Sequence, residues 1–569
     1  MQNCDNAIIS EEYADILIRT GSGIVSGKYC SKEVTPKWEI YYIPIYSTGR
    51  LTFDKFGYVA LPDMYVPSDI NIANESGVSD VFLQPALSLD GENVIVGVID
   101  TGIDYGHKAF LDVNGKSRIL SIWDQTINSD NAPNNFSYGT EYTKEDIDTA
   151  LRLKDPYELV KTTDIYGHGT FLTGIVAGSP DLENNFTGIA PNADIVFVKL
   201  KPAKDVMKEV FAISKEKVVY EETDIMLAIK YIDEVAKREK KQAVILLGLV
   251  TSQGSHKGTS PLADTFNYYS GMIGRVLVTS AGNESNRGRH FFGKIGEEGL
   301  ESVELRVGDN ETGFVTELWS GQTVLVTLSI TSPSGESISR IPIRREYSEE
   351  YSFVLEKTTI YIYSSIIQNA SGLELILLKF VTPTSGIWRI DVYGNMNDEY
   401  NMWLPAGEII SSDTYFLNSN PDITVTEVGN TEDVITVGAY DYRDGTAFIN
   451  SGRGYSLNGT IKPDIVAPGV NVLGPLSADT LSQGARLDDR NRYTLMTGTS
   501  VAAAVTTGVA TLITSWEEEQ DNTYYVDTRF IKTLLIRGAK RDANYIYPNR
   551  IQGYGKLNAI GVFEFLKGR

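Results

Sequence analysis

Cysteine is scarce in this chain of 569 residues, and long apolar runs are absent. Cysteine occurs only at positions 4 and 30, which excludes a disulfide framework and is compatible with a reducing compartment. No apolar run reaches the roughly eighteen residues of a membrane span, and the densest stretch, 243–250, has the length of a buried strand. The N-terminus has neither a basic start nor an apolar core, so we expect no secretory signal and an intracellular location.

Positive charge is also in deficit. Lysine and arginine total 51 against 74 aspartates and glutamates, which leaves a net charge of −23. Such a field repels phosphate backbones and anionic lipid, and this argues against a nucleic-acid or membrane-surface partner. Apolar residues at 42% and charged residues at 22% are globular values, and the length suggests roughly two to four domains.

The pattern of apolar and polar residues changes along the chain and predicts four segments. Residues 1–70 have the pattern of a small α+β unit that ends in a turn-rich loop. In 71–287, continuous apolar strands alternate with helical segments, which is typical of an α/β fold with a mostly parallel sheet covered by helices. Residues 288–425 alternate polar and apolar side chains in short runs, which predicts an inserted antiparallel β-sandwich, and 426–569 return to the α/β pattern.

Three local motifs carry residues that are suited to catalysis, and each also has a structural interpretation. Asp100 ends an apolar strand, where open α/β sheets place their active sites, but it could instead cap a turn. His168 lies between two glycines at a predicted helix start, as a general base or simply in a turn. Ser500 opens a helix of small residues, as a nucleophile or an ordinary N-cap.

Two observations narrow these alternatives. Asp-Thr-Gly at 100–102 is also the motif of aspartic proteases, but that mechanism needs two such motifs or a dimer, and the chain contains one. The order Asp, His, Ser is one of the known orders of a catalytic triad. A further candidate is Asn283, directly after an apolar strand, whose amide could donate to an oxyanion or cap a turn.

With these motifs the chain resembles the subtilase (subtilisin-like serine protease) family. The resemblance rests on VIDTGID around Asp100, GHGT at His168, SAGN at Asn283 and GTSVAAA at Ser500, with GIAP at 188–191 and KPDIVAPG at 462–469. It implies a triad of Asp100, His168 and Ser500 with Asn283 as oxyanion donor. It also implies that an extended protein substrate binds beside Leu247, Gly248, Ala281 and Gly282.

More narrowly, the chain resembles the clostridial Csp-type spore-germination proteases, on its N-terminal sequence, its Gly-Thr-Ser-Val-Ala-Ala variant and the insertion point after Asn283. The resemblance implies a prodomain at 1–70 that acts as intramolecular chaperone and inhibitor, and self-cleavage near residues 64–76. It further implies a jelly-roll-like insert, a spore-associated location and activation of a cortex-lytic pro-enzyme. The insert could brace the fold or dock a protein partner.

The chain also departs from the family pattern. Ala504 stands where a proline is usual, and Leu246 stands in the position of the serine of the substrate-flanking Ser-Leu-Gly. The loop between Ala177 and Gly188 carries oxygen ligands without a convincing series of calcium ligands, so no cofactor is predicted and calcium is undecided. Two alternatives to an open protease stay in place: a self-cleaving scaffold with an occluded cleft, and a pseudoprotease-like sensor of germinants.

Overall fold

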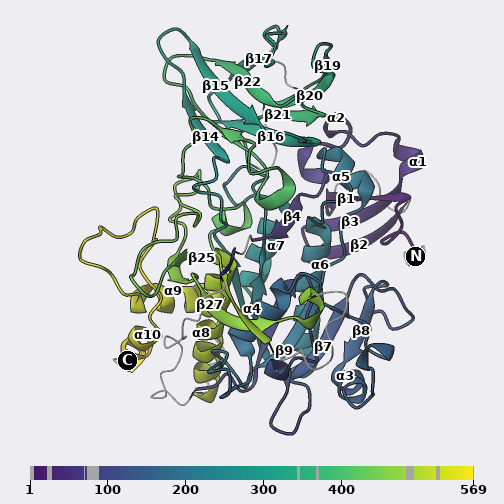
Figure 1. Ribbon diagram of the computed structural model, residues 1–569, viewed down its shortest axis with the longest axis vertical. Coiled ribbons are helices and arrows are strands. Elements are labelled where there is room, and N and C mark those ends of the chain that lie inside the picture. The colour runs from purple at the N-terminus through teal and green to yellow at the C-terminus, as the bar shows by residue number, and fades with distance from the viewer. Residues whose placement is uncertain are drawn as a thin grey trace.

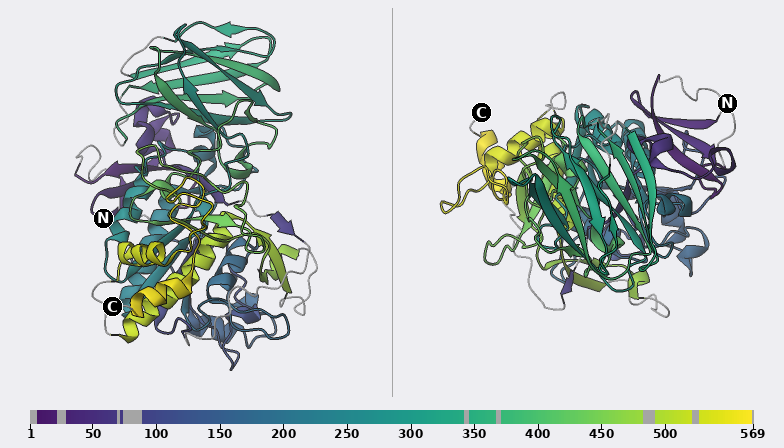
Figure 2. Two further views of the ribbon diagram at one scale, coloured as in Figure 1. Left: turned by 90° about the vertical axis from the view of Figure 1, so that its left-hand side faces the viewer. Right: turned by 90° about the horizontal axis from the view of Figure 1, so that it is seen from above.

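The computed structural model describes residues 6–21, 29–68, 71–73, 89–341, 346–366, 371–481, 492–520 and 526–567. Figure 1 shows three regions: an α/β body below, a β-sandwich above it, and a small N-terminal unit in purple at the side. The same arrangement, with the sandwich standing on the body, is visible from a second side in Figure 2.

The body is built on an eight-stranded sheet of order β26-β25-β13-β11-β6-β9-β7-β8, in which only the β7–β8 pair is antiparallel. The strands are β6 (Val94–Asp100), β7 (Ile119–Asp124), β8 (Thr140–Thr143), β9 (Asp194–Lys199), β11 (Gln242–Leu247), β13 (Arg275–Ser280), β25 (Ile435–Tyr440) and β26 (Ile465–Pro468). Every residue of β6 is buried because helices cover both faces. The predicted α/β class and parallel sheet are confirmed.

Helices cover both faces of the sheet, and alternate side chains of a strand pack against the helices on opposite faces. Val94, Val96 and Val98 pack into the apolar cluster that contains α4 and α8, whereas Ile95 and Ile99 pack with α6 and α7. The helices of the body are α3 (Lys144–Ala150), α4 (His168–Ala177), α5 (Asp205–Val210), α6 (Glu222–Glu239), α7 (Pro261–Ser270), α8 (Thr499–Glu519), α9 (Thr528–Gly538) and α10 (Ala559–Lys567). Among the described residues, α8 is the one helix with the length and hydropathy of a membrane span, and 89% of its apolar window is buried in this core.

The insert is a sandwich of two antiparallel sheets, as predicted. One has the order β14-β23-β16-β21-β20-β19 and the other the order β18-β17-β22-β15-β24. Its strands are β14 (His290–Lys294), β15 (Leu300–Val307), β16 (Gly313–Ser320), β17 (Thr327–Thr331), β18 (Ser337–Ile338), β19 (Glu346–Phe353), β20 (Thr358–Ser365), β21 (Glu374–Val381), β22 (Gly386–Tyr393), β23 (Glu399–Trp403) and β24 (Tyr415–Phe416). In β15 the alternation that predicted a strand turns Val303, Leu305 and Val307 inward.

The N-terminal unit is a three-stranded sheet of order β1-β3-β2, formed by β1 (Tyr13–Arg19), β2 (Cys30–Thr35) and β3 (Trp38–Pro44) and followed by the short helices α1 (Ile45–Thr48) and α2 (Phe53–Phe56). Cys30 is disulfide-bonded, which differs from the expectation of a fold held without disulfides. The other cysteine, at position 4, lies outside the described residues.

After this unit the chain enters the body. β4 (Met64–Pro67) lies between β10 (Tyr220–Glu221) and β12 (Leu249–Val250), antiparallel to both. Further along, β5 (Asn71–Ala73) pairs with β28 (Arg492–Thr497), which also pairs with β27 (Val472–Leu476). The connection between the first two predicted segments therefore runs through the body (Figure 1).

Candidate active site

Three side chains from distant parts of the chain meet at the carboxyl end of the central sheet. Asp100 is the last residue of β6, His168 the first of α4, and Ser500 lies in the first turn of α8. His168 Nδ1 lies 2.7 Å from Asp100 Oδ1, and its Nε2 lies 3.2 Å from Ser500 Oγ. All three side chains are buried, so the series carboxylate, imidazole and hydroxyl is shielded from bulk water.

Close approach of α4 to β6 depends on a glycine. A Cβ at Gly169 would lie 2.2 Å from the carbonyl oxygen of Gly102 and 3.1 Å from Cβ of Asp100. Any larger residue would therefore push the helix and His168 away from Asp100. The second glycine of the Gly-His-Gly motif thus serves packing rather than a turn.

A second carboxylate, Asp164, supports this junction, and the sequence motifs did not reveal it. Its Oδ1 accepts hydrogen bonds from Thr101 Oγ1 at 3.0 Å and from the Gly167 amide at 2.9 Å. Its Oδ2 accepts from the amide and the hydroxyl of Thr170, at 2.9 and 2.7 Å. Burial raises the pKa of Asp164, and these bonds work against that rise. Asp164 ties the residue after Asp100 to the first turn of the His168 helix.

Asn283 lies beside the nucleophile, with its amide oriented by Thr499. Asn283 Oδ1 accepts from both the amide and the hydroxyl of Thr499, each at 3.0 Å. This assigns the NH₂ group to the opposite side, where Nδ2 donates to Ser68 Oγ at 2.8 Å. Thr499 Oγ1 also accepts from the Gly282 amide at 3.1 Å. An amide donor is thereby aimed at the space in front of Ser500.

That space holds a segment of the chain itself. Ser68, which follows β4, is 1% exposed, and its hydroxyl occupies the Asn283 donor. The Ser68 amide donates to the Gly248 carbonyl at 3.3 Å, which continues the β4–β12 pairing to the catalytic residues. Upstream, the Tyr65 side chain is 1% exposed and joins the apolar cluster of Tyr220 and Leu249. The N-terminal unit therefore places its tail in the candidate cleft as an extended strand.

The residues that pair with this tail lie further along the chain than the sequence predicted. Leu246 and Leu247 belong to β11 and pair inside the central sheet, Leu247 with Ile99 and Thr279. Pairing with the tail begins at the Gly248 carbonyl and continues through β12. The expected role of Leu247 is therefore wrong: in an unbroken apolar run, sequence does not mark where the strand leaves the sheet.

Gly248 itself lies directly against the catalytic pair. A Cβ there would lie 2.1 Å from Asp100 Oδ2 and 3.1 Å from His168 Cε1. Ala281 and Gly282, also expected beside substrate, bond to the framework: Ala281 N donates to Val437 O at 2.9 Å, and Gly282 N to Thr499. They lie behind the Asn283 donor.

A side pocket borders the tail next to His168. It is lined by Val66, Pro67, Ser68, Tyr166, His168, Glu216, Lys217, Val218, Val219, Tyr220, Glu408 and Ile409. Lys217 Nζ donates to the Glu408 carbonyl at 2.7 Å, which connects the loop before β10 to the segment returning from the sandwich. The insert therefore contributes to the wall of the cleft.

In the loop between Ala177 and Gly188, which the sequence left open as a calcium site, the Asp181 carboxylate bonds to neighbouring side chains. Asp181 Oδ2 lies 2.7 Å from Lys108 Nζ and accepts from Asn184 Nδ2 at 2.8 Å, and these bonds lower the pKa of Asp181 to about 2 although burial opposes them. Within the described ranges, no group of three His, Cys, Asp or Glu side chains is placed to hold a metal ion.

Comparison with known proteins agrees with this geometry. The model of the subtilase family matches residues 91–312 and 394–555, which cover both parts of the body and the two ends of the sandwich segment. The structure of the CspB protease of Clostridium perfringens is similar with a TM-score of 0.74 and 30% identity, over 85% of this chain and 95% of that one.

Two curated relatives match shorter stretches. The serine protease AprX of Bacillus subtilis is 40% identical over 153 residues, which are 25% of this chain and 32% of AprX. An uncharacterized protein of Aquifex aeolicus, aq_aa18, is 32% identical over 190 residues, 31% of this chain and 82% of that protein. Since the family model spans both halves of the body and includes all four candidate catalytic residues, the chain belongs to the subtilase family, the subtilisin-like serine proteases.

Proposed function

We propose that this chain is a serine endopeptidase of subtilisin type that cleaves itself on the carboxyl side of Ser68 and then acts on a protein substrate by limited proteolysis. The observation that carries the proposal is that the chain's own tail ends, in extended form, at the hydrogen-bonded series of Asp100, His168 and Ser500.

The chemistry proposed is acyl transfer. Ser500 Oγ attacks the carbonyl carbon of the peptide while His168 Nε2 takes the hydroxyl proton, and Asp100 Oδ1 holds the imidazole through Nδ1–H. The C–N bond then breaks and His168 returns the proton to the leaving amine. Water repeats the cycle on the acyl-enzyme, with His168 again as base, and releases the free acid.

Charge that develops on the carbonyl oxygen needs donors, and two are available. Asn283 Nδ2 is oriented by Thr499, and the backbone amide of Ser500 lies at the N-terminus of α8, where amides lack helical partners. In subtilisin, loss of one such donor costs about 10²–10³ in turnover.

The tail also indicates which substrates fit. If cleavage follows Ser68, the residue before the bond is small, Pro67 lies two positions before it, and the buried Tyr65 lies four positions before it. We therefore propose as substrates protein segments that bind as an added strand between β10 and β12, with an aromatic side chain in the Tyr65 position and a small residue at the cleaved bond.

The Csp-type role is part of the proposal. The similarity to CspB over 85% of this chain supports a Csp-type protease, and we propose that it activates another protein. From the germination resemblance, we propose a cortex-lytic pro-enzyme as that protein and a spore-associated location. The insert, which borders the cleft at Glu408, is proposed to dock the protein partner.

Purification of the full chain tests self-cleavage. We expect two fragments, with the larger one beginning at Asp69 by N-terminal sequencing, and an intact chain for Ser500→Ala. Ser515→Ala is the matched control, because Ser515 is a buried serine of the same helix whose hydroxyl donates to the Glu92 carbonyl at 2.9 Å, away from the cleft. Cutting of the purified Ser500→Ala chain at residue 68 would show that another protease does the work.

A second candidate is favoured by the buried site: a chain that cuts itself once and then keeps its tail in the cleft. His168 is 3% exposed and Ser500 fully buried while the tail is present. A fluorophosphonate probe separates the two. Labelling of Ser500 after cleavage supports an open enzyme, whereas cleavage without labelling supports the occluded scaffold.

A further inference from the structure

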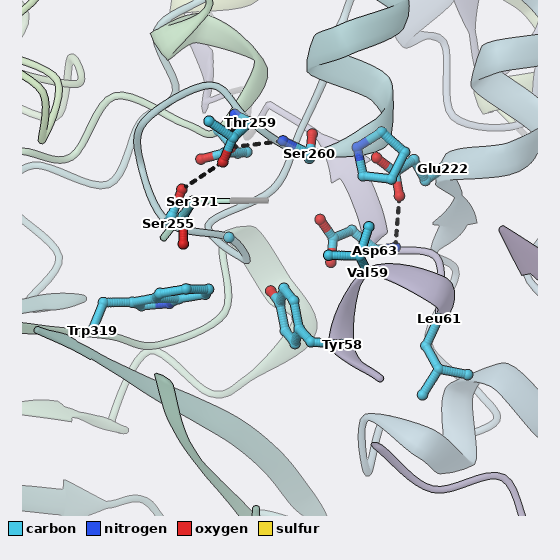
Figure 3. Close-up of a pocket in the computed structure, with 13 residues that line it drawn as sticks. Tyr58, Val59, Leu61, Asp63, Glu222, Ser255, Thr259, Ser260, Trp319 and Ser371 are labelled. Carbon is cyan, nitrogen blue, oxygen red and sulfur yellow. Dashed lines mark hydrogen bonds between the residues drawn. The ribbon is translucent and has the colours of Figure 1, made fainter. Parts of the chain in front are cut away.

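Four buried carboxyl groups gather where the N-terminal unit, the body and the sandwich meet. Asp63 precedes β4, Glu222 begins α6, Glu317 lies in β16, and Glu427 lies in the segment that re-enters the body. None is more than 4% exposed. Asp63, Glu222 and Glu427 line a small cavity of about 20 Å³, and Glu317 bonds to two of its lining residues, Tyr58 and Gly254. Figure 3 shows Asp63 and Tyr58 facing Glu222 and Trp319.

These groups contact the tail directly. The Asp63 amide donates to Glu222 Oε2 at 3.3 Å, and the Glu222 amide donates back to the Asp63 carbonyl at 3.0 Å. Tyr58 Oη lies 2.9 Å from Glu317 Oε1. Asp63 and Tyr58 belong to the N-terminal unit, whereas both glutamates belong to the parts that it covers. The cluster is therefore an interface, and it ends one residue before the strand that fills the cleft.

The cluster lacks balancing positive charge. Within the described part of the chain, none of the four carboxylates forms a salt bridge. Lys257 lies at the rim, where its Nζ donates to the Ser371 carbonyl at 3.3 Å and burial lowers its pKa. Burial also lowers the pKa of His256 to about 3, which leaves that ring neutral. The ionisable groups around the pocket are Tyr58, Asp63, Tyr65, Glu222, His256, Lys257, Glu317 and Glu427.

We propose that Asp63, Glu222, Glu317 and Glu427 form a proton-dependent clasp, which holds the tail in the cleft at mildly acidic pH and loosens as the pH rises. Four carboxylates cannot all be ionised in one unbalanced, buried cluster, so the closed interface retains protons that an opened, hydrated one releases. The inference rests on the proposed function in one respect: that withdrawal of β4 opens the active site.

The pH window follows from the linkage between proton binding and opening. Burial raises the pKa of Glu317 to about 7 from an ordinary 4.5, with Glu427 adding to the rise, and hydrogen bonds from Trp319 and Gly254 work against it. Burial followed by repulsion from Glu222 raises the pKa of Asp63, and burial raises that of Glu222. Because the closed state binds more protons, its stability falls as pH rises from 4.5 and levels off above 7.

Glutamine at position 317 should mimic the protonated acid. Gly254 N and Trp319 Nε1 both donate to Glu317 Oε2 at 3.0 Å, and a glutamine oxygen can keep both bonds. Tyr58 Oη donates to the other oxygen, Oε1, and the glutamine NH₂ group at that position would instead donate to Tyr58 Oη, as the O–H of a protonated acid can. Glu317→Gln therefore removes the titration with little change in shape.

Hydrogen exchange on the full-length Ser500→Ala chain tests the clasp without any need for cleavage. Protection factors, corrected for the chemical exchange rate, are measured for residues 61–68 between pH 5.5 and pH 8, with β11 as internal reference. We expect protection of 61–68 to fall at least tenfold over this range, since a shift of one pKa unit is worth tenfold, while that of β11 is unchanged.

In the Glu317→Gln variant, the loss of protection of residues 61–68 between pH 5.5 and pH 8 should be severalfold smaller. Glu374→Gln is the matched control, because Glu374 is another buried glutamate of the same sheet and bonds to Ser320 Oγ at 2.7 Å instead of the tail. The clasp is overturned if the protection of residues 61–68 does not change with pH in the Ser500→Ala chain. It is also overturned if the Glu317→Gln and Glu374→Gln variants show the same pH dependence. Failure of self-cleavage alone leaves this readout intact, so the two proposals fail separately.

Discussion

At the scale of single residues, the site depends on groups that hold the reactive ones in place. Thr499 orients Asn283 through two hydrogen bonds, and Asp164 accepts four bonds that join Thr101 to the His168 helix. Neither is expected to touch the reacting atoms. Both lie at helix starts, where backbone amides are free to bond to side chains.

Thr499→Val removes the hydroxyl with little change of volume. The Asn283 amide then loses one of its two restraints, and the Gly282 amide loses its acceptor. We expect self-cleavage to slow about tenfold to a hundredfold, somewhat less than the loss of a whole oxyanion donor. A time course of the uncut fraction on gels measures it.

A conservative variant distinguishes a positioning role of Thr499 from a general loss of stability. Thr499→Ser should restore most of the rate, because it keeps the hydroxyl. Thr506→Val, which removes a buried hydroxyl that donates to the Ala502 carbonyl at 3.0 Å on the same helix, should cleave normally. A Thr499→Val chain that cleaves at the normal rate contradicts the assigned role.

Asp164→Asn should destabilise the body. An amide offers one acceptor oxygen to four donors and turns its NH₂ group toward some of them, so buried donors lose their partners. We expect the free energy of unfolding in urea to fall by about 1–3 kcal/mol, measured in the Ser500→Ala background. The exposed Asp130→Asn should stay within about 0.5 kcal/mol, and an equal loss in both variants would argue against a special role for Asp164.

At the scale of elements, the three-stranded sheet β10-β4-β12 joins the N-terminal unit to the cleft. It is short, with two residue pairs on each side of β4, so backbone hydrogen bonds alone give little retention. The largest side chain of β4, Tyr65, is 1% exposed and packs with Tyr220 and Leu249. Retention of the tail is therefore expected to depend on one aromatic residue.

Tyr65→Ala tests this dependence. Truncation of a buried aromatic side chain costs about 3–5 kcal/mol, which exceeds what two short strand pairings restore. We expect the fluorophosphonate probe to label Ser500 at least tenfold faster than in the unchanged chain. Tyr46→Ala, at a tyrosine of the same unit that is 88% exposed, should label like the unchanged chain, and unaltered labelling of Tyr65→Ala would refute the aromatic anchor.

At the scale of the whole molecule, the N-terminal unit is held by two different charge clusters. One is the unbalanced carboxyl clasp. The other contains lysines: Asp15 of β1 pairs with Lys204, which also donates to the Ala7 carbonyl at 3.3 Å, and Lys201 pairs with Asp224 at 2.7 Å. Glu221 lies among these groups, where burial and then Asp15 raise its pKa to about 8. The Asp15–Lys204 ion pair ties the unit to the body independently of the clasp, so we expect the clasp to adjust the tail rather than to detach the unit.

Asp15→Asn or Lys204→Met, each alone, leaves a buried charge without its partner. Asp15 is 1% and Lys204 2% exposed, so each single change should destabilise the docked unit by about 3–5 kcal/mol, measured by thermal unfolding. The double variant should recover part of this loss. Strictly additive losses in the double-mutant cycle would mean that the pair is not coupled.

The sequence by itself determined the large divisions and the reactive residues of this protein. Continuous apolar strands against alternating ones separate the body from the sandwich, because burial on two faces or one leaves different periodicities. Asp100, His168, Asn283 and Ser500 could be identified because each follows a strand or begins a helix in a recognisable local motif.

Only the tertiary structure decided what these residues touch. Three features have no local sequence pattern. The chain leaves β11 at Gly248, Asp164 and Thr499 support the site, and Asp63 meets Glu222 and Glu317. Each depends on segments tens to hundreds of residues apart, and an isolated buried carboxyl looks in sequence like any surface acid. Periodicity reports how much of a segment is buried, whereas its neighbours are set by how the whole chain packs.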